Sequence, residues 1–175
     1  GQDPRKLVIV GPCSIHNINE AFDYGRSIKP LAEEVQDQLL IVMRTYLEKP
    51  RTAGGWTGLM TDPDLNGSDD IDKGVELSRR LLVNLAELGL PTATETLDPY
   101  LVQYISDLVT WTCIGARTAE SQIHRKLGSG LSTPIGAKNG TDGNIETAIN
   151  ALKVIRGENS FVGMDQDGKY SKVDA

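Results

Sequence analysis

The sequence predicts an α/β fold built around a parallel β-sheet. Five times along the chain, a short apolar run that is typical of a buried strand is followed by a segment that predicts a helix. This alternation is typical of βα units, in which a crossover connection lets successive strands pair in parallel. The end of the chain differs, because Ser160–Met164 and Tyr170–Val173 flank Asp167-Gly168, a pair typical of a hairpin turn. We therefore expect five βα units and a β-hairpin in a single domain, residues 1–175.

The first βα unit begins with the apolar run Lys6–Val10, which predicts a strand. Asn17 is a candidate N-cap for a helix over residues 20–36. Pro30 lies inside that helix, where it is expected to cause a kink or a division. The β-branched run Leu39–Tyr46 predicts the second, buried strand.

The second crossover starts with a long glycine-rich loop, Ala53–Gly67, of the kind that more often serves a site than a core. Ser68–Asp70 then predicts the cap of a helix that ends at Gly89. Its apolar stripe is Ile71, Val75, Leu82 and Leu85. A third, weaker strand is predicted over Pro91–Glu95.

The remaining elements follow at short intervals. Pro99 is expected to open a helix whose apolar face holds Val102, Ile105 and Leu108-Val109. After it we expect strand four at Thr110–Arg117, a short helix at Gln122–Leu127 that breaks at Gly128 and Gly130, strand five at Thr133–Lys138, and a helix with the stripe Ile145, Ile149, Leu152 and Ile155.

Composition and charge argue against nucleic-acid-binding, membrane-spanning and secreted proteins. The net charge of −6 argues against a nucleic-acid binder, which needs a basic surface. No apolar run approaches the roughly 20 residues that span a bilayer, and no secretory leader precedes the first strand. Cys13 and Cys113 lie 100 positions apart and show no disulfide spacing. We therefore expect a cytoplasmic protein without membrane or nucleic-acid partners.

Charged or reactive side chains stand at the carboxyl end of every predicted strand. They are Cys13, then Arg44 with Lys49 and Arg51, then Glu95, Arg117 and Lys138. Because parallel strands end at one edge of a sheet, which is where α/β folds carry their sites, we expect these side chains to lie together. Their sum is cationic in an acidic chain, which favours a phosphorylated and doubly anionic substrate. Gly115-Ala116 can add backbone N–H groups as an anion nest beside Arg117.

Each of these residues also has a structural interpretation. Cys13 alone is more often a small buried apolar residue, and Glu95 can serve only to neutralise nearby cations. His16, three residues after Cys13, is a metal ligand or, more in keeping with a lone Cys-x-x-His pair, a hydrogen-bonding group near the site. His124 is expected to be a surface or packing residue. Trp56 is expected to pack the glycine-rich loop or to line the pocket.

Five motifs together resemble one known enzyme family. They are Gly11-Pro12-Cys13-Ser14-Ile15-His16, Met43-Arg44 with Glu48-Lys49-Pro50-Arg51-Thr52, Gly115-Ala116-Arg117-Thr118, Glu120-Ser121-Gln122, and Lys138-Asn139-Gly140-Thr141-Asp142-Gly143. In this order they are similar to class I 3-deoxy-D-arabino-heptulosonate-7-phosphate (DAHP) synthase, over about residues 7–155.

That resemblance implies a (β/α)₈ TIM barrel, of which this chain supplies about the first five βα units and a hairpin. It implies the condensation of phosphoenolpyruvate with erythrose 4-phosphate, the first step of the shikimate pathway, aided by a divalent metal ion of the Mn, Fe, Co or Zn type. By resemblance Cys13 is a metal ligand, and Lys49 and Glu95 are catalytic. The groups implied to bind substrate are Arg44, Lys49, Pro50, Arg51, Thr52, Gly115, Ala116, Arg117 and Lys138. A homo-oligomer is expected when the barrel is complete.

The chain departs from the family pattern in length. A (β/α)₈ barrel usually takes about 250 residues, so we expect the C-terminal half of the barrel, with the other metal ligands, to be absent from the sequence. Two alternatives remain open: 3-deoxy-manno-octulosonate 8-phosphate synthase, or a catalytically inactive phosphate-binding fragment. The turn Lys49-Pro50-Arg51-Thr52 argues against the first, because that enzyme carries a different sequence there. Metal-dependent turnover by the chain would exclude the second.

Overall fold

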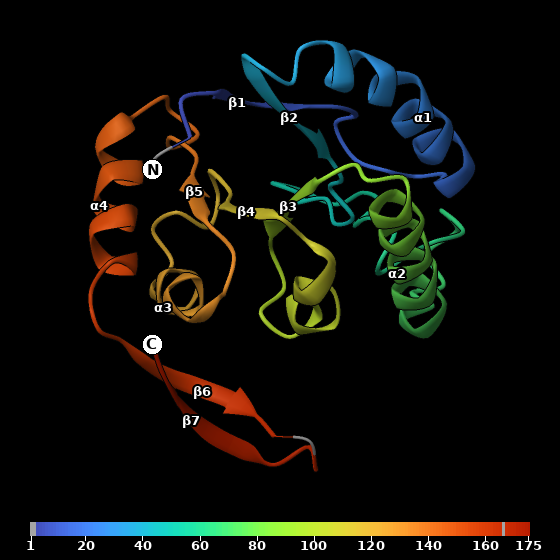
Figure 1. Cartoon of the computed structure of the whole chain (residues 1–175). Coiled ribbons are helices and arrows are strands. Elements are labelled where there is room, and N and C mark those ends of the chain that lie inside the picture. The colour runs from blue at the N-terminus through green and yellow to red at the C-terminus, as the bar shows by residue number, and fades with distance from the viewer. Residues whose placement is uncertain (1–2, 166) are drawn as a thin grey trace.

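A curled, five-stranded parallel sheet organises the chain (Figure 1). The computed structural model describes residues 3–165 and 167–175. In sheet order the strands are β1 (Lys6–Val10), β2 (Leu39–Arg44), β3 (Thr92–Thr96), β4 (Trp111–Ile114) and β5 (Ile135–Ala137). Each strand pairs in parallel with the next one along the chain. All five strands therefore end at the same edge, as the βα alternation predicted.

The first two helices cover β1 to β3 and enclose the main core. Helix α1 (Ile18–Glu34) begins at Asn17, whose side chain accepts hydrogen bonds from two backbone N–H groups of the first turn. Pro30 does not divide α1, contrary to one of the predicted outcomes. Its ring removes one backbone donor, but the turns on both sides of it keep their helical hydrogen bonds. Helix α2 (Ile71–Glu87) begins at Asp70, whose carboxylate accepts from the Lys73 N–H.

The packing of α1 on α2 is close because of one small residue. A Cβ atom at Gly25 would lie 2.6 Å from Leu85 Cδ2. The core below this contact consists of buried side chains from β2, the following loop and α2: Met43, Leu47, Leu59, Met60, Leu81, Leu82 and Leu85. This core supports the loop that leaves β2, and so it also supports the edge where the strands end.

The predictions for two helical segments after β3 need correction. The segment after Pro99 forms two short 3₁₀ helices, Leu101–Tyr104 and Ser106–Leu108, because the Asp98 side chain accepts from two N–H groups and tightens the first turn. Helix α3 (Gln122–Gly130) continues through Gly128, where a Cβ atom would be only 3.3 Å from Ile155. The helix therefore keeps a glycine for close packing.

Helix α4 (Ile145–Ile155) forms where it was predicted but buries a different face. Ala148 and Ala151 are buried, whereas Ile145 and Ile149 are exposed to 67% and 46%. Small side chains let α4 lie close against α3 and β5, so Ile145 and Ile149 face away from that contact, whereas Ile155 lies against Gly128 of α3.

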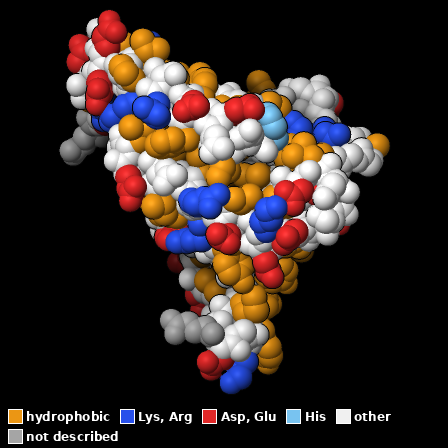
Figure 2. Space-filling model, turned by 90° about the vertical axis from the view of Figure 1, so that its right-hand side faces the viewer, with side chains coloured by type: hydrophobic (Ala, Val, Ile, Leu, Met, Phe, Trp, Pro, Cys, Tyr) orange, Lys and Arg blue, Asp and Glu red, His pale blue; other side chains and the backbone are white. Residues whose placement is uncertain are grey.

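The chain ends in an antiparallel hairpin, β6 (Ser160–Met164) and β7 (Tyr170–Asp174), which projects away from the sheet (Figure 1). Figure 2 shows hydrophobic side chains along this narrow lower projection. Val162 of β6 and Tyr170 of β7 are exposed. Within the residues that the structure describes, every helix is too short or too polar to cross a bilayer.

Candidate active site

A cavity of about 370 Å³ opens at the carboxyl edge of the sheet. It collects the predicted residues Cys13, Arg44, Lys49, Pro50, Arg51, Thr52, Glu95, Arg117 and Lys138, together with Ser14, Tyr46, Ala53 and Gly54. These residues come from the ends of all five strands, so the shared edge brings together side chains up to 125 positions apart in sequence. The expectation of one cationic rim is therefore confirmed in its geometry.

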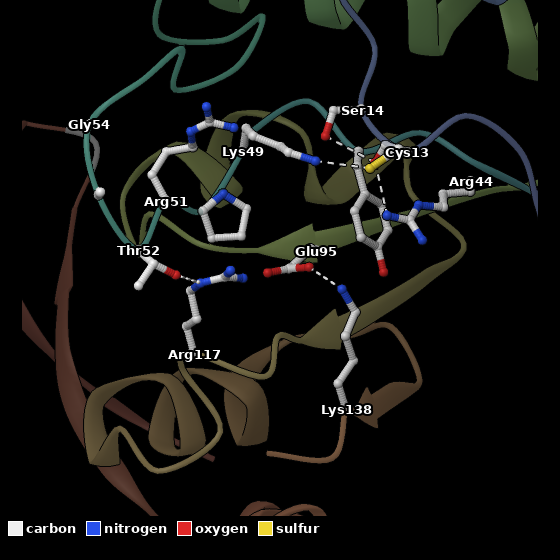
Figure 3. Close-up of a pocket in the computed structure, with 13 residues that line it drawn as sticks. Cys13, Ser14, Arg44, Lys49, Arg51, Thr52, Gly54, Glu95, Arg117 and Lys138 are labelled. Carbon is white, nitrogen blue, oxygen red and sulfur yellow. Dashed lines mark hydrogen bonds and ion pairs between the residues drawn. The ribbon is translucent and has the colours of Figure 1, made fainter. Parts of the chain in front are cut away.

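The charge of the cavity is one-sided. Five lysine and arginine side chains line it, and Glu95 is its only carboxylate. Glu95 is 5% exposed and forms an ion pair with Lys138. Figure 3 shows its carboxylate between Arg117 and Lys138. Four cations remain without a carboxylate in the cavity wall, and such an array favours an anion with more than one negative charge.

Glu95 reaches this position because Gly115 has no side chain. A Cβ atom at Gly115 would overlap Glu95 Oε1 and lie 2.6 Å from its Cδ. Gly115 therefore does not line the cavity, although it was predicted to bind substrate. Ala116 does not line it either and contributes with Arg117 to a neighbouring cavity of about 520 Å³. The absence of a side chain at Gly115 thus makes room for a buried carboxylate, and the anion nest of Gly115-Ala116 stays a prediction.

Cys13 stands at the exposed rim of the cavity, just after β1. The ammonium group of Lys49 donates a hydrogen bond of 2.9 Å to its sulfur (Figure 3). This hydrogen bond, more than any other contact, lowers the pKa of the Cys13 thiol. Arg44 donates from Nη2 to the Cys13 carbonyl oxygen at 2.8 Å. The thiol is therefore held in a cationic setting that favours the thiolate.

The loop that carries Lys49, Arg51 and Thr52 is anchored at its base. The Lys49 N–H donates to the Thr57 carbonyl oxygen at 2.8 Å, and Glu48 forms an isolated β-bridge with Gly58. Thr52 accepts a 3.0 Å hydrogen bond from Arg117 Nε, which ties this loop to the end of β4. Contacts with Thr57 and Arg117 thus hold the loop at two points, and its cations line the cavity.

Glu48 is a buried group that the sequence analysis did not single out. Its side chain is 6% exposed, and its carboxylate accepts from the Asp98 N–H at 3.2 and 3.3 Å. Burial, with a smaller contribution from the charges of Asp98 and Glu95, raises its pKa from 4.5 to about 7. The buried run that begins in β2 continues through Leu47 and Glu48.

The two histidines and Trp56 lie outside the cavity. His16 is exposed, and its Nε2 is 3.6 Å from Glu20 in α1, so it does not take the predicted hydrogen-bonding role at the site. His124 contacts Ser121 Oγ and the Leu97 carbonyl oxygen, which confirms a packing role. Trp56 donates from Nε1 to the Asp62 carbonyl oxygen and packs on the core, so it holds the loop down.

The donor groups for a metal ion are incomplete in this part of the chain. Among residues 3–165 and 167–175, no three His, Cys, Asp or Glu side chains gather so that they could hold an ion. Cys13 supplies one suitable thiol, but its nearest polar partner is the Lys49 ammonium group, which is a donor. The described residues therefore do not form a metal centre by themselves.

Comparisons with known proteins agree with the geometry. The sequence profile of the DAHP synthetase I family matches residues 1–173. The chain is 54% identical over 171 residues to the Tyr-sensitive phospho-2-dehydro-3-deoxyheptonate aldolase of Salmonella typhimurium, covering 98% of this chain and 48% of that protein. It is 53% identical to the Trp-sensitive enzyme of Escherichia coli, covering 49% of it. The chain thus spans about half the length of the curated relatives it matches.

Solved structures give the same result. The phospho-2-dehydro-3-deoxyheptonate aldolase of Francisella tularensis superposes with a TM-score of 0.94 at 45% identity, over 98% of this chain and 50% of that one. The enzyme of Thermotoga maritima, at 23% identity and a TM-score of 0.61, shares the fold over 89% of this chain. Since the family profile covers almost the whole sequence and the same strands superpose, this chain belongs to the DAHP synthetase I family.

Proposed function

We propose that this chain supplies the substrate-binding part of a DAHP synthase, which condenses phosphoenolpyruvate with erythrose 4-phosphate. The observation that carries the proposal is the convergence of five cations and one buried carboxylate in a single cavity at the strand ends. Phosphoenolpyruvate carries a carboxylate and a phosphate, and erythrose 4-phosphate carries a second phosphate. Two anions that repel each other in water need such an array before they can approach.

Each group has a distinct part in this arrangement. Arg44, Lys49, Arg117 and Lys138 bind the carboxylate and phosphate of phosphoenolpyruvate, the arginines through paired N–H groups and the lysines as point charges. Arg51, with Pro50 and Thr52, binds the phosphate of the sugar. Glu95 keeps the Lys138 ammonium group in place through their ion pair.

The chemistry then follows from orientation and charge. C3 of the enol phosphate attacks the aldehyde carbon, positive charge develops at C2, water adds there, and phosphate leaves by C–O cleavage. The cations stabilise the phosphate as its negative charge grows in this last step. Because the loop is anchored at Lys49 and Thr52, little reorganisation is needed when the anions arrive.

The proposed function is tested by calorimetric titration of the chain with each substrate. We expect phosphoenolpyruvate to bind, and erythrose 4-phosphate to bind more tightly than arabinose 5-phosphate. Arg51→Ala should weaken the binding of erythrose 4-phosphate by about 10-fold or more, since a hydrogen bond to a charged group contributes about 1.5–3 kcal/mol. The same variant should change phosphoenolpyruvate binding by less than about threefold, an effect of at most about 0.7 kcal/mol.

Arg26→Ala is the matched control, because Arg26 is exposed on α1 and makes only a 3.9 Å contact with Asp23. It should leave both affinities unchanged. Equal losses for the two substrates in Arg51→Ala would contradict the role given to Arg51. A preference for the pentose phosphate would contradict the proposed reaction.

We also propose that Cys13 supplies one ligand to a divalent metal ion, whose other ligands come from the part of a full-length family member that this sequence does not contain. A bound ion of this kind would polarise the aldehyde. Adding Co²⁺ to the full-length enzyme that contains this segment should produce a thiolate-to-metal absorption band in the near ultraviolet, and Cys13→Ser should remove it. Cys113→Ser is the control, since Cys113 is buried and should not contribute. A band that survives in Cys13→Ser would exclude Cys13 as the ligand.

A further inference from the structure

Tyr46 lies in the wall of the cavity and contacts two of its cations. It follows β2 by two residues and is 5% exposed. The guanidinium carbon of Arg44 is 3.8 Å from the centroid of its ring, and the ammonium nitrogen of Lys138 is 4.6 Å from the same centroid. Both distances are within the range in which the negative face of an aromatic ring attracts a cation. The two cations come from β2 and from the end of β5, and this ring is a contact that they share.

The ring matters because each cation is only partly satisfied by hydrogen bonds. Arg44 donates from Nη2 to the Cys13 carbonyl oxygen, but its buried Nε has no hydrogen-bond partner in the described part of the chain. Lys138 is paired with Glu95. A buried guanidinium group with an unpaired donor is stabilised if the flat group rests on an aromatic face. The ring therefore replaces part of the stabilisation that the Arg44 guanidinium group would otherwise gain from hydration.

The hydroxyl group of Tyr46 takes no direct part in this contact. It forms a 2.9 Å hydrogen bond with the sulfur of Cys113, which is 1% exposed. Burial raises the pKa of the Tyr46 hydroxyl far above its usual value, and burial also raises the pKa of the Cys113 thiol. Both groups stay neutral, so Tyr46 acts on the cations through its ring face and not as a phenolate counter-ion.

We propose that Tyr46 is a positioning residue for the anion site, whose ring holds Arg44 and Lys138 in the cavity wall before the anion binds. The inference rests on the proposed function, since it takes the anion to be phosphoenolpyruvate. Without the ring, the two cations would separate towards solvent, and the incoming phosphate or carboxylate would have to gather them. An aromatic ring suits this task better than a carboxylate, because it adds no negative charge to compete with the substrate.

The test changes the electron density of the ring without changing its shape. Position 46 is substituted with phenylalanine and then with phenylalanines that carry one, two and three fluorine atoms, which progressively remove negative charge from the ring face. Phenylalanine is the reference for the series, because it keeps the ring face and loses only a hydrogen bond between two neutral groups. The logarithm of the dissociation constant should then rise linearly with fluorination, to about 10-fold for three fluorines, as expected for two cations on one ring. A purely structural role would not produce this linear trend.

A second measurement needs no ligand. The ε-protons of Lys138, observed by NMR in the full 175-residue chain, should be shifted upfield by the ring current of position 46. The shift should persist in Tyr46→Phe and disappear in Tyr46→Leu. Because Tyr46→Leu can also weaken the core, the fluorinated series remains the test if this variant fails to fold.

The outcomes separate the two proposals. A flat fluorine series in a chain that binds phosphoenolpyruvate would overturn the role of Tyr46 and leave the proposed function standing. Absence of the upfield shift in the wild type would also overturn the role of Tyr46. A chain that shows the shift but binds no phosphoenolpyruvate would contradict the proposed function while supporting the ring–cation arrangement.

Discussion

Replacing Gly115 with alanine should destabilise the chain by about 3 kcal/mol and weaken phosphoenolpyruvate binding by at least about 10-fold. The added Cβ atom would overlap Oε1 of Glu95, a carboxylate that is 5% exposed, and would push it towards the cavity that it lines. Overpacking of this kind costs about 1–3 kcal/mol, and displacing the carboxylate also breaks its pair with Lys138. Since the Lys138 side chain is 36% exposed, water weakens that pair, and most of the loss comes from the overlap.

The affinity for phosphoenolpyruvate falls because the same overlap displaces Glu95. A displaced Glu95 carboxylate moves towards the space in which the substrate anion must lie, and Lys138 loses the partner that fixes its ammonium group. Urea unfolding measures the first effect, and calorimetric titration with phosphoenolpyruvate measures the second.

Gly54→Ala is the matched control, because Gly54 lines the same cavity and a Cβ atom there would have no neighbour within 4 Å. A double-mutant cycle identifies the cause. In the background of Glu95→Ala the overlap no longer exists, so Gly115→Ala should cost at least about 1 kcal/mol less than it does in the wild type. If the cost of Gly115→Ala is the same in both backgrounds, the overlap with Glu95 is not the reason for the glycine.

The strand ends were predictable because two simple patterns coincide. Each strand is a short apolar or β-branched run, and the first charged or reactive group follows it at once, as Arg44 ends β2 and Lys138 follows β5. Parallel pairing then places these groups at one edge whatever the details of the helices. The composition of the cavity follows from topology, which is why the sequence was sufficient for Cys13, Lys49, Arg117 and their neighbours.

The residues that were missed act through tertiary contacts that no local pattern encodes. Gly115 was predicted only to offer an N–H group, and the space that it leaves for Glu95, 20 positions earlier, was not predicted. Glu48 stands beside Lys49 in the sequence, and its burial depends on the connection after β3, where the Asp98 N–H donates to its carboxylate. The two glycines near the end of α3 predicted a break in the helix. The helix instead continues, because Gly128 packs closely against Ile155. In each case a neighbour distant in sequence outweighs the local preference.

Glu48→Gln should make the chain more stable than the wild type above pH 7, by up to about 3 kcal/mol, and should remove a pH dependence of stability. The Glu48 carboxyl group has a pKa of about 7 in the folded chain instead of 4.5, with burial as the main cause. Between these two values the folded state binds the proton and the unfolded state does not. The stabilising effect of the proton is therefore complete below about pH 4.5 and is lost as the pH rises to 7. Since one pKa unit corresponds to about 1.4 kcal/mol, the charged carboxylate lowers the free energy of unfolding by about 3 kcal/mol at pH 8.

Glutamine suits position 48 because one oxygen atom is sufficient to accept the hydrogen bond from the Asp98 N–H. Both carboxylate oxygens of Glu48 accept from the Asp98 N–H, so the amide oxygen of glutamine can take over that contact. The charges of Asp98 and Glu95 add to the effect of burial and favour the neutral form. Urea unfolding of both chains from pH 5 to pH 8 measures the difference, with Glu87→Gln at the exposed end of α2 as the control. If Glu48→Gln and the wild type keep a constant difference across this range, then Glu48 is charged throughout, and its burial must be compensated by a contact other than the Asp98 N–H.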